Sequence, residues 1–327
     1  MIPLSVLDLS PIIEGGNASD SLRNSLDLAQ HVERWGFKRY WLAEHHGMPG
    51  IASAATSVVI GHVAAGTTTL QVGAGGIMLP NHAPLVIAEQ FGTLESLFPG
   101  RIDLALGRAP GTDQATAHAL RRNLASSVDQ FPQDVVELMA YFNAAGAEQQ
   151  VHAIPGAGLS VPIWILGSSL FGAQLAAHLG LPYSFASHFA PAQMMDAIAI
   201  YREQFKPSEY LAAPYVMLGC SMFAADDAKD AHLLASSWQQ AFVNLYSGRP
   251  GKLPPPVADY LDSLSSMERH MLQGVFDCTV IGSPDQVSEQ VNQFVEKTGA
   301  NELIIACQCY NHDARLRSYE IVAEVLI

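Results

Sequence analysis

The hydrophobic positions of this 327-residue chain follow two alternating patterns. One is a series of short, almost uninterrupted apolar runs, which is typical of parallel β-strands covered on both faces. The predicted strands are Leu4–Leu9, Lys38–Ala43, Leu70–Met78, Ile102–Gly107, Ile163–Gly167, Tyr183–Ala186, Tyr215–Ala224 and Leu303–Ala306.

The second pattern is amphipathic and lies between these runs. In Ser21–Trp35, Leu22, Leu26 and Ala29 recur at helical spacing, and Asp20 stands just ahead as a candidate N-cap. Similar segments are Ala83–Leu97, Phe171–Leu179, Ala192–Phe205, Asp226–Leu245, Asp285–Thr298 and Asp313–Leu326. Strands and helices that alternate in this way favour a closed (β/α)8 TIM barrel over an open sheet.

Two segments interrupt the alternation. Asn143–Val161 is rich in Gly, Ala and Pro, and Tyr246–Met271 contains a run of three prolines. We therefore expect a single domain over residues 1–327, with insertions after the fourth and seventh strands. Loops of this length often act as lids or interface arms.

Composition narrows the function classes. The formal charge of −14 argues against nucleic acid and anionic membrane surfaces, because both attract clustered Lys and Arg. The chain has no apolar run of the roughly 18–20 residues that a membrane helix needs, and it has no signal-peptide pattern.

Its four cysteines lack zinc-ligand spacing, which favours buried free thiols over a disulfide or a metal site: Cys220, Cys278, Cys307 and Cys309. We expect a cytoplasmic protein.

Polar side chains follow several predicted strands at the carboxyl end, where α/β folds keep their active sites. Glu44, His45 and His46 follow the second strand, Arg108 follows the fourth, and Gly167-Ser168-Ser169 follows the fifth and opens a helix. An Arg fork and the free N–H groups of a helix start both suit a phosphate or carboxylate. A surface ion pair and an ordinary Ser N-cap are the alternatives.

Glycines are concentrated at the third strand, at Gly73, Gly75 and Gly76. Glycine weakens a strand, so this cluster indicates either a ligand close to the backbone or a β-bulge.

Together these residues carry a resemblance. The chain is similar to the bacterial luciferase-like family of flavin-dependent monooxygenases, and most of all to its single-gene branch. The matching motifs occur in order and with the family's spacing at Leu42–His46, Val72–Pro80, Gly100–Gly111 and Ile165–Ser169, and the match continues to Ile281–Val287. Each motif is moderately specific, and the ordered set is strong.

The resemblance implies a (β/α)8 barrel that binds FMN non-covalently at its mouth. By position, Arg108 and the Gly167-Ser168-Ser169 helix start would hold the phosphate, and Gly75–Gly76 would form a cis peptide beneath the flavin ring. Ser168 departs from the family, since the light-emitting subunits carry an acidic residue there. Gly172 departs as well, since a phosphate-contacting Thr is expected at its position.

His45 matches the catalytic histidine of the family, and the neighbouring Glu44 would orient its ring or tune its pKa. The implied reaction has two components. A separate NAD(P)H:flavin reductase supplies reduced FMN, and one oxygen atom from O2 enters an organic substrate. Met78 stands where a third glycine would complete a nicotinamide-binding Gly-x-Gly-x-x-Gly turn, so the reductant is expected from elsewhere.

The substrate and the assembly are less sharply defined. Phe171, His188, Phe189 and Tyr246 indicate an apolar guest, aromatic or long-chain. The segments Ile51–Ala65 and Ala83–Leu97 are apolar around most of their circumference, which favours a homodimer over packing within one barrel.

Three other functions stay open. A metallohydrolase would use Glu44, His45 and His46, with His82, His188 or Asp8 as further ligands, although neighbouring residues of an extended chain point in opposite directions. A deazaflavin- or NAD(P)H-dependent oxidoreductase on the same fold would differ in the cofactor that it binds. A catalytically silent FMN-binding protein would show no turnover.

Overall fold

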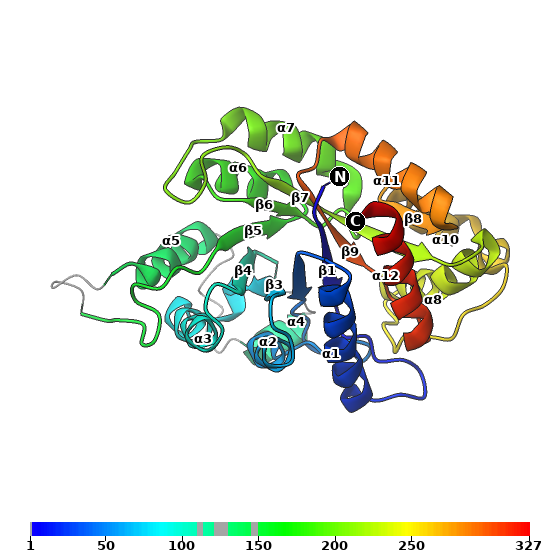
Figure 1. The fold of residues 1–327 in the computed structure, drawn as a ribbon, viewed down its shortest axis with the longest axis horizontal. Coiled ribbons are helices and arrows are strands. Elements are labelled where there is room, and N and C mark those ends of the chain that lie inside the picture. The colour runs from blue at the N-terminus through cyan, green and yellow to red at the C-terminus, as the bar shows by residue number, and fades with distance from the viewer. Residues whose placement is uncertain (1, 110–113, 121–129, 145–149) are drawn as a thin grey trace.

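The computed structural model describes residues 2–109, 114–120, 130–144 and 150–327. In this part of the chain eight parallel strands close into a barrel in the order β1-β2-β3-β4-β5-β6-β7-β9, and β9 pairs with β1 (Figure 1). The predicted (β/α)8 TIM barrel is confirmed. The barrel strands are β1 Leu4–Asp8, β2 Arg39–Leu42, β3 Gln71–Met78, β4 Ile102–Gly107, β5 Ile163–Gly167, β6 Tyr183–Phe185, β7 Val216–Ala224 and β9 Glu302–Ala306.

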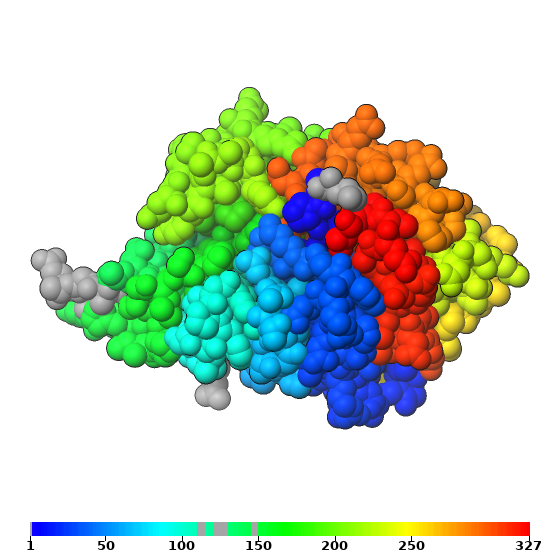
Figure 2. All heavy atoms as spheres, viewed as in Figure 1, coloured from blue at the N-terminus to red at the C-terminus, as the bar shows by residue number. Residues whose placement is uncertain are grey.

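Helices surround the barrel. The first and last of them, α1 and α12, pack together and lie side by side on the face shown in Figure 2. This contact joins the two ends of the chain. No helix in the described residues is both long and apolar enough to cross a membrane. The helices are α1 Ala18–Arg34, α2 Thr56–Ala65, α3 Pro84–Leu97, α4 Gln114–Leu120, α5 Phe131–Phe142, α6 Leu170–Leu179, α7 Met194–Gln204, α8 Ala228–Tyr246, α9 Tyr260–Ser263, α10 Ser266–Phe276, α11 Pro284–Thr298 and α12 His312–Leu326.

Helix α1 corrects one prediction. Its N-cap is Asn17, whose side chain accepts a hydrogen bond from the backbone N–H of Asp20 at 3.1 Å. Asp20, the predicted cap, instead lies in the first turn, where its negative charge is favourable near the positive end of the helix dipole.

A ninth strand, β8 (Thr279–Gly282), was not predicted and lies outside the barrel. Strand β7 is nine residues long, so its first part pairs with β9 and its last four residues pair with β8. The pairing runs from Ser221 opposite Thr279 to Ala224 opposite Gly282. Helix α8 packs against this extension of the sheet, and the insertion follows α8.

Alternate residues of the strands face opposite sides, which divides the core into two clusters. The larger one lies between the strands and the helices. The smaller one fills the barrel interior with Leu7, Trp41, Ala43, Ala105, Trp164, Met217 and Ile304. Near the amino ends of the strands, the guanidinium of Arg39 bridges the buried carboxylates of Asp103 (2.6 Å) and Glu302 (3.0 Å).

The insertion after β7 lies across the loops that follow β1 and β2. The backbone N–H of Leu253 donates to the carbonyl of Ile12, and the N–H of Ile12 donates to the carbonyl of Gly50, both at 2.9 Å. A Cβ at Gly50 would lie 2.3 Å from the carbonyl oxygen of Gly251, so the two segments are in close contact. The insertion therefore covers part of the barrel mouth, a position that suits the predicted lid or arm.

Candidate active site at the barrel mouth

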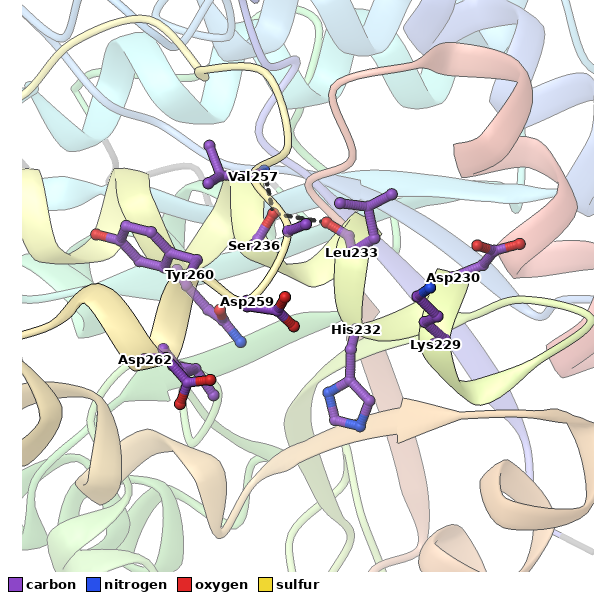
Figure 3. Close-up of a pocket in the computed structure, with 12 residues that line it drawn as sticks. Lys229, Asp230, His232, Leu233, Ser236, Val257, Asp259, Tyr260 and Asp262 are labelled. Carbon is purple, nitrogen blue, oxygen red and sulfur yellow. Dashed lines mark hydrogen bonds between the residues drawn. The ribbon is translucent and has the colours of Figure 1, made fainter.

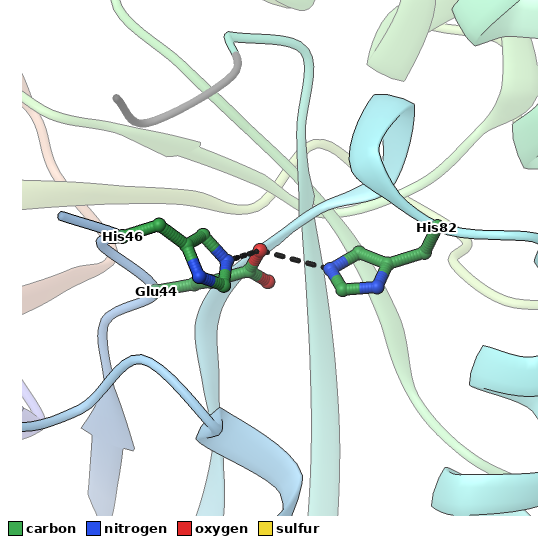
Figure 4. A group of neighbouring side chains, drawn as sticks. All are labelled: Glu44, His46 and His82. Carbon is green, nitrogen blue, oxygen red and sulfur yellow. Dashed lines mark hydrogen bonds and ion pairs between the residues drawn. The ribbon is translucent and has the colours of Figure 1, made fainter. Parts of the chain in front are cut away.

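Glu44 is the centre of a hydrogen-bonded group at the carboxyl ends of β2 and β3 (Figure 4). Its Oε1 lies 2.8 Å from Nε2 of His46 and 2.8 Å from Nε2 of His82, and its Oε2 accepts the backbone N–H of Met78 at 3.0 Å. Burial alone would raise the pKa of Glu44, but the hydrogen bonds and charge of these partners outweigh it and hold the pKa below its ordinary value. Glu44 is therefore a buried carboxylate whose oxygens are bonded by two imidazoles and a backbone N–H.

This arrangement fixes the rings of His46 and His82. Because each Nε2 faces a carboxylate oxygen, each ring carries a proton on that nitrogen. The sequence predicted that Glu44 would orient the ring of His45 or tune its pKa; the structure shows its carboxylate bonded to His46 and His82. The donor atoms of these three residues lie within 4.8 Å of one another and could hold a metal ion. Both imidazoles are directed at one carboxylate oxygen, which is the geometry of hydrogen bonds.

His45 is half-buried at the end of β2, and His188 follows β6. Burial and, to a smaller extent, the nearby His45 lower the pKa of His188 to about 4. His188 rests against Gly219 of β7, where a Cβ would lie 2.2 Å from Nδ1 of the ring. The structure therefore brings two imidazoles near each other at the mouth.

The interior layer beneath these histidines consists largely of small residues. Moving toward the carboxyl ends from the interior cluster, the inward positions on β2, β3, β4, β7 and β9 are Ala43, Gly75, Gly107, Gly219 and Ala306. The Gly75–Gly76 peptide is cis, as the resemblance implied. A Cβ at Gly75 would lie 2.9 Å from Leu7 and 3.0 Å from Trp41. These small residues form the floor of the mouth, and Leu7 and Trp41 pack closely against it at Gly75.

Arg108 and the start of α6 are neighbours. The guanidinium carbon of Arg108 lies 4.2 Å from the centroid of the Phe171 ring, in the first turn of α6. Ser169 is the N-cap of this helix, and its side chain makes no capping hydrogen bond. A cation and a helix start with free N–H groups therefore occupy one side of the mouth. Pro110 and Gly111, the end of the Arg108 motif, lie outside the described residues.

Gly167 and Gly172 close the turn into α6. A Cβ at Gly172 would lie 3.7 Å from the Cα of Gly167 and 3.4 Å from the Tyr183 ring, so the helix start is packed tightly against β5 and β6. Ser168 lies between the end of β5 and this N-cap and is exposed.

Aromatic side chains form one wall that the sequence predicted only in part. Phe242 stacks on Tyr246 with ring centroids 4.5 Å apart, and Phe189 lies 6.2 Å and 6.0 Å from these two rings. Phe189 and Tyr246 are exposed. Phe242 and Gly219 were not predicted, because neither belongs to a motif. Only the alternation along β7 could have indicated the inward position of Gly219.

A separate hollow of about 360 Å³ lies on the outer side of α8 (Figure 3). The insertion forms its other side, and the backbone N–H of Val257 donates to the Ser236 hydroxyl at 2.8 Å. Its acidic and basic lining residues are Lys229, Asp230, His232, Asp259 and Asp262. None of the predicted site residues lines it, so the mouth and this hollow are different features.

The fold and the mouth define a (β/α)8-barrel enzyme with its candidate site at the carboxyl ends of the strands. A family model described as luciferase-like monooxygenase matches residues 3–302. A luciferase-like monooxygenase of Escherichia coli (strain K12) is 51% identical over 324 residues, which cover 99% of this chain and 97% of that protein. The chain belongs to the luciferase-like monooxygenase family and is an oxidoreductase.

Two further similarities extend this result. N-acetyl-S-alkylcysteine monooxygenase of Bacillus subtilis (strain 168) is 30% identical over 346 residues, covering 100% of this chain and 99% of that protein. The crystal structure of apo-MsnO8 has a TM-score of 0.88 and 30% identity, covering 99% of this chain and 98% of that one. Both likenesses span the whole barrel, insertions included.

Proposed function

We propose that this enzyme is a two-component monooxygenase, which uses FMN reduced by a separate NAD(P)H:flavin reductase to insert one oxygen atom from O2 into an organic substrate. The observation that carries the proposal is the barrel mouth. There, Gly and Ala residues form the floor, two histidines stand above it, and Arg108 lies beside a helix start. A flat ring suits a floor without side chains, and a phosphate suits an Arg next to free N–H groups.

Bound FMN would supply the chemistry that activates O2. Arg108 and the first N–H groups of α6 would hold its phosphate through charge-assisted hydrogen bonds. The Gly75–Gly76 backbone, whose peptide is cis, would lie beneath the ring, as the resemblance to the family implies. Ser168 replaces the acidic residue of the light-emitting subunits, and Gly172 replaces the expected Thr. Binding of the phosphate would therefore depend on Arg108 and on backbone N–H groups.

His45 would move the proton that the reaction requires, because imidazole is the side chain best suited to proton transfer near neutral pH. Glu44 would act indirectly by fixing the rings of His46 and His82 at the rim. The insertion over the loops after β1 and β2 would limit the access of water to the mouth.

The substrate class follows from the aromatic wall and one relative. Phe189 and Tyr246 present exposed rings near the mouth, which suits an apolar guest. Since the relative from Bacillus subtilis is named for N-acetyl-S-alkylcysteines, we propose alkyl thioethers as the first substrates to test.

We also propose a homodimer formed through α2 and α3. Val59, Ile60 and Val63 of α2 are buried within the subunit, whereas Val58 on the same helix is 72% exposed. Exposed apolar side chains continue on α3 at Val86 and Leu97, and the two helices pack together. A second copy would cover this apolar face.

The test supplies reduced FMN through an added flavin reductase under 18O2, with a panel of alkyl thioethers and aromatic compounds. One 18O atom in the product supports the proposal. Failure of FMN to bind, preferential binding of a deazaflavin, or rapid NADPH oxidation by the protein and FMN without the reductase would each contradict it. Stoichiometric metal with flavin-independent hydrolysis would instead support the metallohydrolase alternative at Glu44, His46 and His82.

A further inference from the structure

His188 occupies a fixed place on the inner wall of the barrel. It follows β6, and its ring rests against Gly219, the inward position above Met217 on β7. A Cβ at position 219 would lie 2.2 Å from Nδ1, so a larger residue would displace the ring. The hydroxyl of the preceding Ser187 donates to the carbonyl of Gly219 at 2.6 Å, which ties the loop to β7.

The two ring nitrogens of His188 have different surroundings. Nδ1 is buried and has no hydrogen-bond partner among the residues that the structure describes. The residue as a whole is half-buried, and among its ring nitrogens burial without a partner is confined to Nδ1, so Nε2 is the nitrogen accessible from the mouth. A buried N–H without an acceptor is costly, so the proton belongs on Nε2 rather than on Nδ1. His188 thus presents an Nε2–H donor to the mouth.

His45 is a titratable group near His188, and it follows β2, on another side of the barrel. The low pKa of His188, about 4 through burial and then through His45, keeps its ring neutral near pH 7. A neutral donor suits the polar edge of a flavin, whose carbonyl oxygens and imine nitrogen are acceptors. A charged imidazole in the same place would be harder to bury.

We propose that His188 is a second ligand-binding histidine, whose Nε2–H donates a hydrogen bond to the polar edge of the bound flavin ring. Gly219 leaves the space in which this imidazole sits, and Ser187 holds its backbone in place. The inference rests on the proposed FMN site and adds a contact on the side of the mouth formed by β6 and β7.

The first test is 15N NMR of histidine-labelled protein, with the signal assigned from its absence in His188→Gln. Without FMN, His188 should be a neutral Nε2–H tautomer near pH 7. Saturating FMN should shift its Nε2 resonance, as a new hydrogen bond requires. An Nδ1–H tautomer, or an unchanged Nε2 resonance in protein saturated with FMN, would overturn the inference while leaving the proposed function intact.

The second test is a cycle of variants with FMN affinity as the readout. His188→Ala should weaken binding about 5- to 10-fold, the loss of one hydrogen bond. His188→Gln, which can place an amide N–H near the position of Nε2, should restore much of it. Gly219→Ala should weaken binding in the wild-type background by displacing the ring, and should have no further effect in His188→Ala.

An equal loss from Gly219→Ala in both backgrounds would contradict the inference, because Gly219 would then act without His188. Full affinity in a folded His188→Ala protein, checked by its thermal melting, would contradict it as well. If wild-type protein binds no FMN, the proposed function itself fails, which the NMR and affinity data distinguish from failure at His188 alone.

Discussion

Replacing Arg39 by Met tests how the amino end of the barrel is held together. Arg39 lies 2.6 Å from Asp103 and 3.0 Å from Glu302, and it lies against the Trp164 ring. Glu302 would keep Lys38 (3.3 Å), the Tyr215 hydroxyl (2.8 Å) and the Ser5 hydroxyl (2.5 Å). Asp103 would keep only the indole N–H of Trp41 at 3.1 Å, since its Oδ1 has no partner in the described residues.

The expected cost is that of a buried charge without its counter-ion, about 3–5 kcal/mol. For a chain of 327 residues the entropy of unfolding is about 0.7 kcal/mol per K, so Arg39→Met should lower Tm by ~4–7 °C. Thermal melting followed by circular dichroism measures this. FMN affinity should be unchanged, because the ion pairs lie at the amino ends of the strands and the mouth lies at the other.

The pH dependence of the stability loss identifies Asp103 as the residue responsible for it. Burial raises the pKa of Asp103 even in the presence of Arg39, and loss of Arg39 raises it further. A carboxyl whose pKa is raised by folding makes its full contribution to stability below its pKa in the unfolded chain. That contribution is lost as the pH rises through its pKa in the folded protein. The deficit of Arg39→Met should therefore grow as the pH rises above the unfolded pKa of an Asp, about 3.9.

Adding Asp103→Asn to Arg39→Met should remove the unpaired charge and recover part of the lost Tm, together with the pH dependence. A melting temperature for Arg39→Met equal to wild type near pH 8 would refute this reasoning. So would a loss that Asp103→Asn does not reduce, because the cost would then come from packing against Trp164 rather than from charge.

Three further predictions concern the mouth and the assembly. Arg108→Ala should weaken FMN binding about 10- to 100-fold, and Arg108→Lys less; equal affinity in a titration would remove Arg108 from the phosphate site. His45→Ala should keep FMN affinity near wild type and cut oxygenation ~100-fold or more, so wild-type turnover would exclude His45 from proton transfer. Val58→Glu should convert a dimer to a monomer in sedimentation, and a wild-type monomer would contradict the dimer.

The sequence predicted the barrel well because its strands are buried on both faces. The eight barrel strands were recognisable as largely apolar runs, and the predicted boundaries differ from the observed ones by at most one residue. Strand β8 was missed because it has four residues with alternating burial, which is too short a pattern to separate from a loop. Its pairing with the end of β7 depends on where the insertion returns, which no local pattern encodes.

The candidate site was predictable by position but not by partner. Strand ends located Glu44, His45 and Arg108, because parallel strands bring their carboxyl ends to one edge. Side chains alternate along an extended chain, so Glu44 and His46 point to the same side. Their contact could therefore have been predicted from the sequence. His82 follows a 3-10 turn at Leu79–Asn81, and the direction of such a turn cannot be derived from hydrophobic periodicity.

The two ends of the barrel interior differ in how their polar groups are used. At the amino end Arg39 and Lys38 offset the charges of Asp103 and Glu302 within the protein, which fills the interior and favours stability. At the carboxyl end the floor is largely Gly and Ala, and Nδ1 of His188 is buried without a partner in the described residues. An interior that is closed by ion pairs at one end admits a ligand only from the other. Substitutions at the two ends should therefore separate stability from flavin binding, and this separation makes Arg39→Met a suitable control for Arg108→Ala.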